Sequence, residues 1–278
     1  MNFAKTLFFA YDAGSANVTM AYAHKLHKQG LSVEAYPLGP AVEIYEKHIP
    51  NLIQQSYLFS EKDTVVLGAS GIHSDYEMNV LMEAKKAGVS KTIIILDSIA
   101  KMETRFLLDG EPLKKDFYPD EIWTKELPLQ LDLSQTSTIV KKIKDPYLEF
   151  IHSVLYKNPL RVTNVLIERF KGEYLVILSE YVRELFGDKF GFDEYDSVRH
   201  VLNAVERAAP KIPILIKTHP AEPKEKYYKL IAVSELNIHS YDGDIHELVY
   251  YSKVVLGINS SVFYETIFLN KPTYSVQI

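Results

Sequence analysis

The feature that most constrains the fold is a regular alternation of short apolar runs with helical patterns. The apolar runs are rich in β-branched and aromatic residues, as in TVVLGA (64–69) and YLVILS (174–179). Strands with both faces buried have this composition, because helices cover both sides of a parallel sheet. The alternation therefore predicts an α/β fold built on doubly wound parallel sheets.

In the first half of the chain we expect strands at 6–11, 31–38, 64–69, 91–97 and 121–125, with helices near 15–29, 41–48 and 75–87. The stretch 128–170 breaks the rhythm and is interpreted as a linker followed by one or two helices. The alternation then resumes, with strands expected at 173–180, 212–220, 236–242, 253–259 and 272–278, and helices near 194–209, 223–234, 244–251 and 261–269.

The length supports two domains, because single hydrophobic cores stop growing at about 250 to 300 residues and this chain has 278. We place the boundary between about 160 and 172, which gives domains at 1–165 and 166–278. The prediction is two Rossmann-like doubly wound domains in tandem, facing each other across a cleft.

Composition excludes several classes of protein. A formal net charge of −5 without a basic stripe argues against a nucleic-acid partner, and the absence of cysteine excludes disulfides and Cys-ligated zinc. The N-terminal segment MNFAKTLFFAYDAGSANV has too few apolar residues for a signal peptide or a membrane span. We therefore expect a cytoplasmic protein without a membrane span.

Polar residues after the strand at 253–259 predict a ligand site, because open α/β sheets bind ligands beyond the carboxyl ends of their strands. This strand leads through Asn259, Ser260 and Ser261 into a helix that we expect to begin at about Ser261. Its first N–H groups suit a phosphate, and Glu265 could accept hydrogen bonds from ribose hydroxyls. The alternative is structural: serine is an ordinary helix cap, and a first-turn glutamate complements the helix dipole.

The same region resembles a known superfamily. GINSSVFYETIFLNKPTYSV, preceded by ILIKTHP and SYDGDIHELVYYSKVVLG, is similar to the C-terminal half of the GT-B nucleotide-sugar glycosyltransferases and UDP-N-acetylglucosamine 2-epimerases, with NKP (270–272) in place of their GKP. In the first half, IIILD (93–97), ETRF (103–106) and PDEIWT (119–124) resemble bacterial polysaccharide-biosynthesis members.

The resemblance implies a metal-independent GT-B-type glycosyltransferase acting in bacterial glycan or polysaccharide biosynthesis. Its substrates would be a nucleoside diphosphate sugar such as a UDP-sugar, bound by residues 166–278, and a glycan or small-molecule acceptor, bound by residues 1–165. No cofactor is implied. The resemblance also places His219 of KTHP at the substrate, Tyr241 and Asp242 at the base through their backbone, and Ser179 and Glu180 at the far end of the nucleotide.

Two loops and one strand end supply the other candidates in the first half. YDAGSAN (11–17) offers small residues and a helix start, and GASGIHSD (68–75) repeats that layout. The candidate catalytic residues are Asp12, His73 and Asp97, and the candidate substrate contacts are Gly14, Ser15, Ser70 and Arg105. Two alternatives remain open: Asp12 could be a helix cap, and Asp97 and Arg105 could simply pair with each other.

Two departures from the superfamily leave other functions open. GT-B chains normally continue with helices past the strand equivalent to PTYSVQI, whereas this chain stops at Ile278, so we expect a shortened C-terminal domain whose uncovered edge predicts a homodimer. The epimerases' opening G-x-R-P-E signature is replaced by YDAGSAN, which counts against epimerisation. A non-catalytic nucleotide- or glycan-binding relative, or a nucleotide-sugar epimerase or hydrolase, remains the alternative.

Overall fold

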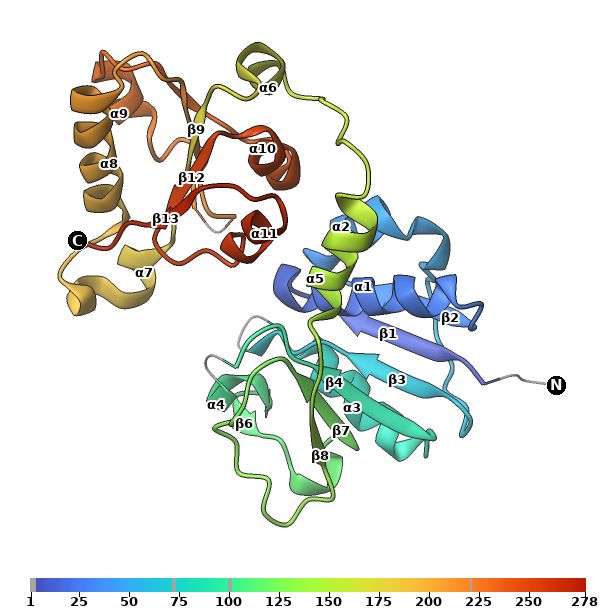
Figure 1. Ribbon diagram of the computed structural model, residues 1–278. Coiled ribbons are helices and arrows are strands. Elements are labelled where there is room, and N and C mark those ends of the chain that lie inside the picture. Colours follow the sequence, from blue (N-terminus) through green and yellow to red (C-terminus); the bar gives the residue numbers. More distant parts are fainter. Residues whose placement is uncertain (1–3, 72–73, 100–101, 221) are drawn as a thin grey trace. The chain divides into compact units, whose positions relative to one another are not determined.

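A computed structural model describes residues 4–71, 74–99, 102–220 and 222–278. The chain divides into two compact units, Met1–Ser153 (unit 1) and Val154–Ile278 (unit 2). Each unit is an α/β layer with its own central sheet (Figure 1). The two units are described separately below.

Within its described residues, unit 1 has a six-stranded parallel sheet in the order β2-β1-β3-β4-β7-β8. Its strands are β1 (Thr6–Ala10), β2 (Val33–Pro37), β3 (Thr64–Leu67), β4 (Lys91–Ile95), β7 (Glu121–Thr124) and β8 (Ile139–Lys142). A small antiparallel pair is formed by β5 (Leu107–Leu108) and β6 (Glu111–Pro112). The helices are α1 (Ala13–Lys28), α2 (Ala41–His48), α3 (Tyr76–Lys86), α4 (Met102–Arg105) and α5 (Pro146–Phe150), with short turns of helix at Pro50–Leu52, Lys115–Phe117 and Ile151–Leu155.

Alternate residues of β1 show why this sheet needs helices on both faces. Leu7 and Phe9 belong to the core that contains Met78 and Leu81 of α3. Phe8 points the other way, where its ring meets the edge of Tyr22 on α1. Successive strand side chains alternate between faces, so an apolar run without polar positions is stable only when both faces are covered.

Unit 2 has a parallel sheet in the order β11-β10-β9-β12-β13 within its described residues. Its strands are β9 (Leu175–Leu178), β10 (Ile214–Lys217), β11 (Ile238–Ser240), β12 (Val254–Gly257) and β13 (Thr273–Ser275). Its helices are α6 (Val165–Phe170), α7 (Val182–Phe186), α8 (Glu194–Ala208), α9 (Tyr228–Val233), α10 (Ile245–Tyr251) and α11 (Phe263–Phe268), with a turn of 3₁₀ helix at Gly187–Phe190.

The central strand β9 is buried on both faces in the same way. Leu175 and Ile177 pack in the core that includes Val201 of α8. Val176 and Leu178 pack in a second core with Leu248 of α10. Figure 1 shows α8 and α9 on one side of this sheet and α10 and α11 on the other. The predicted class, two Rossmann-like α/β layers with parallel sheets, is confirmed.

The interpretation of 128–170 was wrong in one respect, because this stretch contains the strand β8. β8 lies at the edge of its sheet and is largely exposed. Such a strand needs no continuous apolar run, so its sequence, IVKK, lacks the pattern that revealed the buried strands. The short helix α7 was also missed, and α11 begins at Phe263 rather than near Ser261.

The two units meet in the sequence at Ser153 and Val154, ahead of the expected boundary near 160–172. The reason is local: residues 156–164, defined here as the linker segment, are fastened to unit 2. The backbone N–H groups of Thr163 and Asn164 donate to Glu247 Oε1 at 2.6 and 3.1 Å, and Thr163 Oγ1 donates to Oε2 at 2.6 Å. Glu247 is a buried residue of α10. The bonds that attach the linker segment are charge-assisted because their acceptor is a carboxylate.

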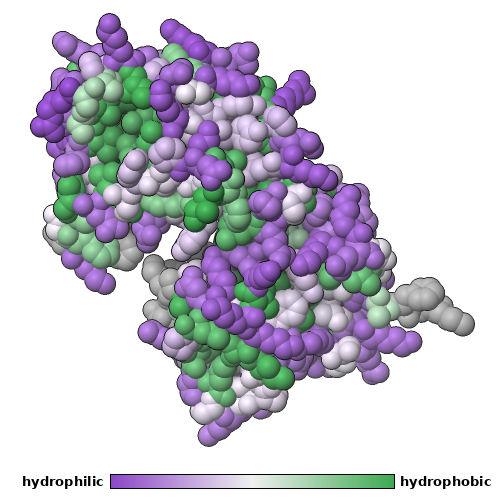
Figure 2. All heavy atoms as spheres, in the orientation of Figure 1, coloured by the Kyte–Doolittle hydropathy of each residue, from purple (hydrophilic) through white to green (hydrophobic). Residues whose placement is uncertain are grey.

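The distribution of polar and apolar side chains on the surface adds little to the fold class. On the face drawn in Figure 2, hydrophilic side chains predominate, with hydrophobic patches between them. Exposed apolar side chains include Val233 and Ile267, and Tyr274 on the edge strand β13. Among the described helices, none has the length and apolarity needed to cross a membrane. The homodimer stays a prediction.

Candidate functional site

Sheet topology singles out one place in each unit. Numbered in chain order, the strands of the unit 1 sheet run 2-1-3-4-5-6 and those of unit 2 run 3-2-1-4-5. The order reverses between β1 and β3 in unit 1, and between β9 and β12 in unit 2. Ligands of open α/β sheets bind beyond the carboxyl ends of the strands at such switch points.

The switch point of unit 1 joins two loops through hydrogen bonds. Asp12 follows β1 and caps α1, because its Oδ1 accepts from the Ser15 N–H at 2.7 Å. Ser70 follows β3, and its Oγ accepts from the Asp12 N–H at 3.1 Å. The same hydroxyl donates to Glu77 Oε1 at 2.6 Å. The Glu77 carboxylate, which was not among the residues predicted from the sequence, therefore holds both loops.

Glu77 is the missed residue of this site. Its Oε1 also accepts from the Tyr11 N–H at 2.9 Å and lies 3.4 Å from Ser15 Oγ. The residue is 1% exposed, and its Oε2 is buried without a hydrogen-bond partner in the described structure. Burial raises the pKa of the Glu77 carboxyl. No sequence signal marks it, because a glutamate in the first turn of a helix is ordinary.

Asp97 lies just beyond β4, on the same edge of the sheet. Arg105 Nη1 donates to Asp97 Oδ1 at 2.7 Å and to the Ala69 carbonyl at 2.9 Å. Burial raises the pKa of Asp97, Arg105 opposes that rise, and the nearby charge of Asp12 adds to it. A Cβ on Gly14 would lie 2.6 Å from Asp97 Oδ2, so only glycine allows the α1 backbone to come this close.

The predicted residues of unit 1 thus gather at one sheet edge, but several are already engaged. Asp12 has the capping role and Asp97 pairs with Arg105, the two structural alternatives left open by the sequence. Ser15 and Ser70 are buried. His73 lies outside the described residues.

The switch point of unit 2 brings Glu180 beside Asn259. The register pairs Leu178 of β9 with Gly257 of β12, so the residues that follow these two strands are neighbours. Glu180 is partly buried, and burial raises the pKa of its carboxyl to about 7. The charge of Glu222 acts in the same direction, and the Asn259 backbone N–H opposes it.

Ser179 belongs to a buried network rather than to an open surface. It is 6% exposed, and its Oγ donates to Glu222 Oε1 at 3.1 Å and lies 2.7 Å from the Tyr227 hydroxyl. Lys226 bonds Glu222 at 2.5 Å and also contacts Glu194. Two buried carboxylates are thereby paired with one buried ammonium group, which is how charges are tolerated in a protein interior.

His219 and Tyr241 follow β10 and β11. The His219 ring stacks on Tyr181 with centroids 6.3 Å apart, and burial lowers the pKa of His219. Its backbone N–H donates to Glu222 Oε2 at 2.7 Å. Tyr241 is 2% exposed and its hydroxyl donates to the Asp244 carbonyl at 3.1 Å. The Tyr241 side chain is therefore engaged within unit 2, whereas the Asp242 side chain is exposed, and the contact of their backbone with a base stays a prediction.

The Asn-Ser-Ser turn differs from the helix start that we expected. α11 has six residues, Phe263–Phe268, and no side chain caps it. Ser260 Oγ instead accepts from the Val262 N–H at 3.3 Å, and the Phe263 N–H donates to the Ser260 carbonyl at 3.1 Å. The residues 259–261 form a turn ahead of a short helix, so the helix dipole is a weaker argument here than the side chains.

The two carboxylate oxygens of Glu265, on α11, differ in their hydrogen-bond partners. Oε2 lies 2.8 Å from His246 Nδ1 on α10 and accepts from the Tyr156 hydroxyl of the linker segment at 3.0 Å. Oε1 has no hydrogen-bond partner among the described residues, and it is not one of the solvent-sealed oxygens. One oxygen is therefore fixed by the protein, and the other has no partner in the described structure, on a side chain that is 5% exposed.

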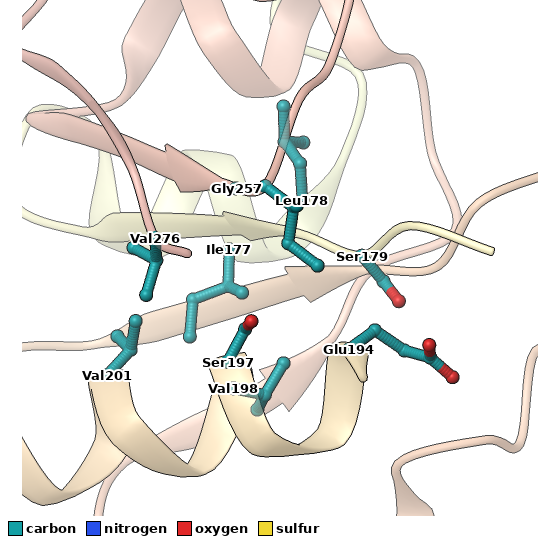
Figure 3. A pocket seen from close by; sticks show the side chains of 10 residues that line it. Ile177, Leu178, Ser179, Glu194, Ser197, Val198, Val201, Gly257 and Val276 are labelled. Carbon is teal, nitrogen blue, oxygen red and sulfur yellow. The ribbon is translucent and has the colours of Figure 1, made fainter. Parts of the chain in front are cut away.

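A small cavity lies beneath the switch point of unit 2. Figure 3 shows Ile177, Val198, Val201 and Val276 around it, with Ser197 and Glu194 projecting from α8. Its volume is about 10 Å³, which is the space of one water at most. Ser197 Oγ, which lines it, is buried without a partner in the described structure. The cavity is too small to hold a nucleotide.

Solved structures share this architecture. MnaA from S. aureus, in a co-structure with UDP, gives a TM-score of 0.63 at 11% identity, covering 98% of this chain and 79% of that chain. A putative UDP-N-acetylglucosamine 2-epimerase from Listeria monocytogenes gives 0.63 at 11% identity, covering 97% and 78%. UDP-GlcNAc 2-epimerase from Neisseria meningitidis, bound to UDP-GlcNAc, gives 0.61 at 12% identity, covering 98% and 82%. The chain has the GT-B fold.

The GT-B resemblance drawn from the sequence is thus confirmed as a fold. No protein-family model matches the sequence. No curated protein matches it either. The similarity at these identities extends to the fold, so a GT-B function for this chain has to be argued from its own residues.

The buried Glu77 carboxyl generates a prediction about stability. Glu77→Gln keeps an acceptor for the Tyr11 N–H and Ser70 but cannot ionise. A carboxyl whose folded pKa is raised above its ordinary value of 4.5 costs stability as pH rises, because the unfolded chain releases its proton first. The variant should therefore gain stability over wild type above pH 4.5, by about 1.4 kcal/mol per unit of pKa difference.

Urea unfolding followed from pH 4 to pH 8 measures this difference. Glu83 is an exposed glutamate of the same helix, so Glu83→Gln is the control for charge change alone. If the difference in unfolding free energy between Glu77→Gln and wild type stays constant over this pH range, ionisation of the buried carboxyl costs no stability.

Proposed function

We propose that this chain is a nucleotide-sugar enzyme whose unit 2 binds the nucleoside diphosphate and whose unit 1 supplies acid–base groups. The observation that carries the proposal is the available Oε1 of Glu265, on the helix that follows the switch-point strand β12. A carboxylate oxygen in that place can accept hydrogen bonds from the vicinal hydroxyls of a ribose. The S. aureus and Neisseria chains of the same fold were solved with UDP and UDP-GlcNAc.

The surrounding loops suit the rest of a nucleoside diphosphate. The turn 259–261 sits at the switch point, where backbone N–H groups and serine hydroxyls can bind phosphate oxygens without a metal ion. The backbone near Tyr241 and Asp242 is the candidate contact for the base. His219 and Glu180, beyond β10 and β9, are the candidate contacts for the distal phosphate and the sugar.

The reaction that we favour is glycosyl transfer. An acceptor hydroxyl loses its proton to a carboxylate, its oxygen forms the bond to the sugar's anomeric carbon, and the bond from that carbon to the diphosphate breaks, releasing the nucleoside diphosphate. Asp97 is the best-placed base, because its raised pKa suits proton uptake and its Arg105 partner steadies the charged form. Asp12 is held as a helix cap, which makes it the second choice.

Epimerisation at C2 of the sugar is the second candidate. It is favoured by the likeness to two UDP-GlcNAc 2-epimerase folds, with TM-scores of 0.63 and 0.61, and opposed by the absence of a G-x-R-P-E motif at the first loop. The two reactions give different products. A panel of UDP-, GDP-, CMP- and CDP-sugars, with and without acceptors, distinguishes nucleotide release from conversion to the C2 epimer, and binding without turnover indicates a non-catalytic relative.

Glu265→Gln tests the nucleotide site. Tyr156 and the Nδ1–H of His246 are both donors, so they require the amide oxygen of the substituted side chain at the place of Oε2, and the amide NH₂ then replaces the available Oε1. Affinity for the best nucleoside diphosphate should fall about tenfold to a hundredfold, since a charged hydrogen bond contributes roughly 1.5 to 3 kcal/mol. Calorimetric titration measures it.

The matched control is Glu247→Gln. Glu247 is also a buried glutamate of unit 2, but both of its oxygens are taken by Thr163 and Asn164. In this variant the amide oxygen can still accept from the Thr163 and Asn164 N–H groups, so the linker segment stays attached and nucleotide affinity should be kept. Equal losses of affinity in the two variants, or none in Glu265→Gln with its fold intact, would leave Glu265 a structural residue.

Nucleotide-sugar affinity should fall as pH rises through about 7, the pKa of Glu180. The protonated carboxyl is neutral, whereas the carboxylate repels a diphosphate bound at the same switch point, and the loss should be about tenfold. Burial lowers the pKa of His219, so that histidine titrates on the acid side of Glu180. UDP-GlcNAc is the suitable probe, because its diphosphate does not titrate in this range, and Glu180→Gln should flatten the profile between pH 6 and pH 8.

Asp97→Asn should reduce turnover of the active nucleotide sugar by about a hundredfold or more, while its affinity stays within about twofold of wild type. Asp120→Asn is the control: Asp120 is another unit 1 carboxylate, paired with Lys85 at 2.7 Å. Its loss should leave turnover unchanged. Turnover in Asp97→Asn equal to wild type would remove the base assignment without touching the nucleotide site.

A further inference from the structure

We infer that Tyr156 and His246 position Glu265 for the ribose of the bound nucleotide, which makes the linker segment part of the nucleotide site. The inference rests on the proposed function, and it assigns roles to two residues outside the sequence-predicted site. Tyr156 belongs to the linker segment, three residues after the division between the units at Ser153 and Val154. His246 lies in the first turn of α10.

The arrangement of hydrogens follows from the geometry. Glu265 Oε2 lies 2.8 Å from His246 Nδ1 and 3.0 Å from the Tyr156 hydroxyl oxygen. An ionised carboxylate can only accept, so Nδ1 carries a hydrogen and the phenol donates. Tyr156 lies 3.4 Å from the same Nδ1, but that nitrogen's hydrogen is already directed at Oε2. Both donors therefore converge on Oε2, and Oε1 keeps no hydrogen-bond partner among the described residues.

Packing keeps both donors in place. The Tyr156 ring meets the His246 ring edge-on at 6.2 Å and lies 5.7 Å from the Tyr250 ring. Backbone bonds hold His246 itself, since its N–H donates to Asp244 Oδ1 at 2.8 Å. His246 and Glu265 are both buried, at 6% and 4% exposure. A carboxylate held by two donors in a buried site cannot rotate freely, and such preorganisation improves ligand recognition by a fixed acceptor.

A purely structural role makes a different prediction. If the cluster only braced α10 against α11, removing the Tyr156 hydroxyl would weaken binding of every nucleotide equally. If it directs Oε1 at a ribose hydroxyl, the loss must be confined to nucleotides that have that hydroxyl. The ratio of affinities for a ribonucleotide and its 2′-deoxy counterpart therefore separates the two roles.

The experiment compares UDP with 2′-deoxy-UDP, or the same pair for whichever base the panel favours, by calorimetric titration. Wild type should prefer UDP about tenfold, the value of one charge-assisted hydrogen bond. Tyr156→Phe keeps the ring and removes the donor, so the preference should fall to about twofold or less. His246→Leu should do the same, and His246→Asn, whose amide can still donate to Oε2, should restore part of it.

Tyr251→Phe is the matched control. Tyr251 donates its hydroxyl to the carbonyl of Leu160 in the same linker segment, and among the described residues it makes no hydrogen bond to Glu265. This variant removes a tyrosine hydroxyl without removing a donor to Glu265, so it should keep the wild-type preference for UDP. Thermal unfolding of each variant confirms that the fold is intact, and His246→Asn serves if His246→Leu does not fold.

The outcomes separate this inference from the proposed function. Failure of wild type to bind any nucleoside diphosphate would overturn the proposed function itself. Binding without a preference for the ribonucleotide, or a preference that survives in Tyr156→Phe and His246→Leu, would overturn the positioning role and leave nucleotide binding standing. A preference lost in these two variants, kept in Tyr251→Phe and partly restored in His246→Asn supports it.

Discussion

The structure depends on one constraint: parallel strands need crossover connections, which are usually helices, and those helices bury both faces of the sheet. Strand ends such as those of β1, β3, β9 and β12 therefore lead into helices, so polar residues can be used there without disturbing the core. Asp12 after β1 and Asn259 after β12 are both products of this rule. The reversal of strand order distinguishes one position in each sheet from the other strand ends, and ligands of open α/β sheets bind at such positions.

The same constraint explains what the sequence could predict. Buried strands such as 64–67 and 175–178 are recognisable because neither face admits a polar residue. β8 was not predicted, because an edge strand with exposed lysines has no continuous apolar run. The predicted boundary near 160–172 differs from the observed division for a related reason. The linker segment has the sequence of a free connection, but Glu247, which is distant in sequence, binds its backbone N–H groups.

The positions of the candidate residues in the fold were predictable from the sequence, and their contacts were less so. Residues after strands could be named, since the GT-B order of elements places them, and the structure brings Asp12, Ser70 and Asp97 to one edge. What each side chain does depends on partners distant in sequence, such as Glu77 for Ser70 and Glu222 for Ser179. A buried acceptor is invisible in a single sequence, because glutamate on a helix is common whether or not it is buried.

Each unit contains a buried glutamate whose hydrogen-bond donors converge on one carboxylate oxygen, and the two glutamates differ in the surroundings of the second oxygen. Glu77 uses one oxygen for three donors and leaves the other sealed and unpaired, which makes it a group that organises loops. Glu265 also concentrates its donors on one oxygen, but its second oxygen is not among the fully buried, unpaired atoms of the described residues. A sealed oxygen raises the cost of ionisation, whereas an open one lets a ligand complete the hydrogen bonding. The two carboxylates therefore differ in the surroundings of a single oxygen atom.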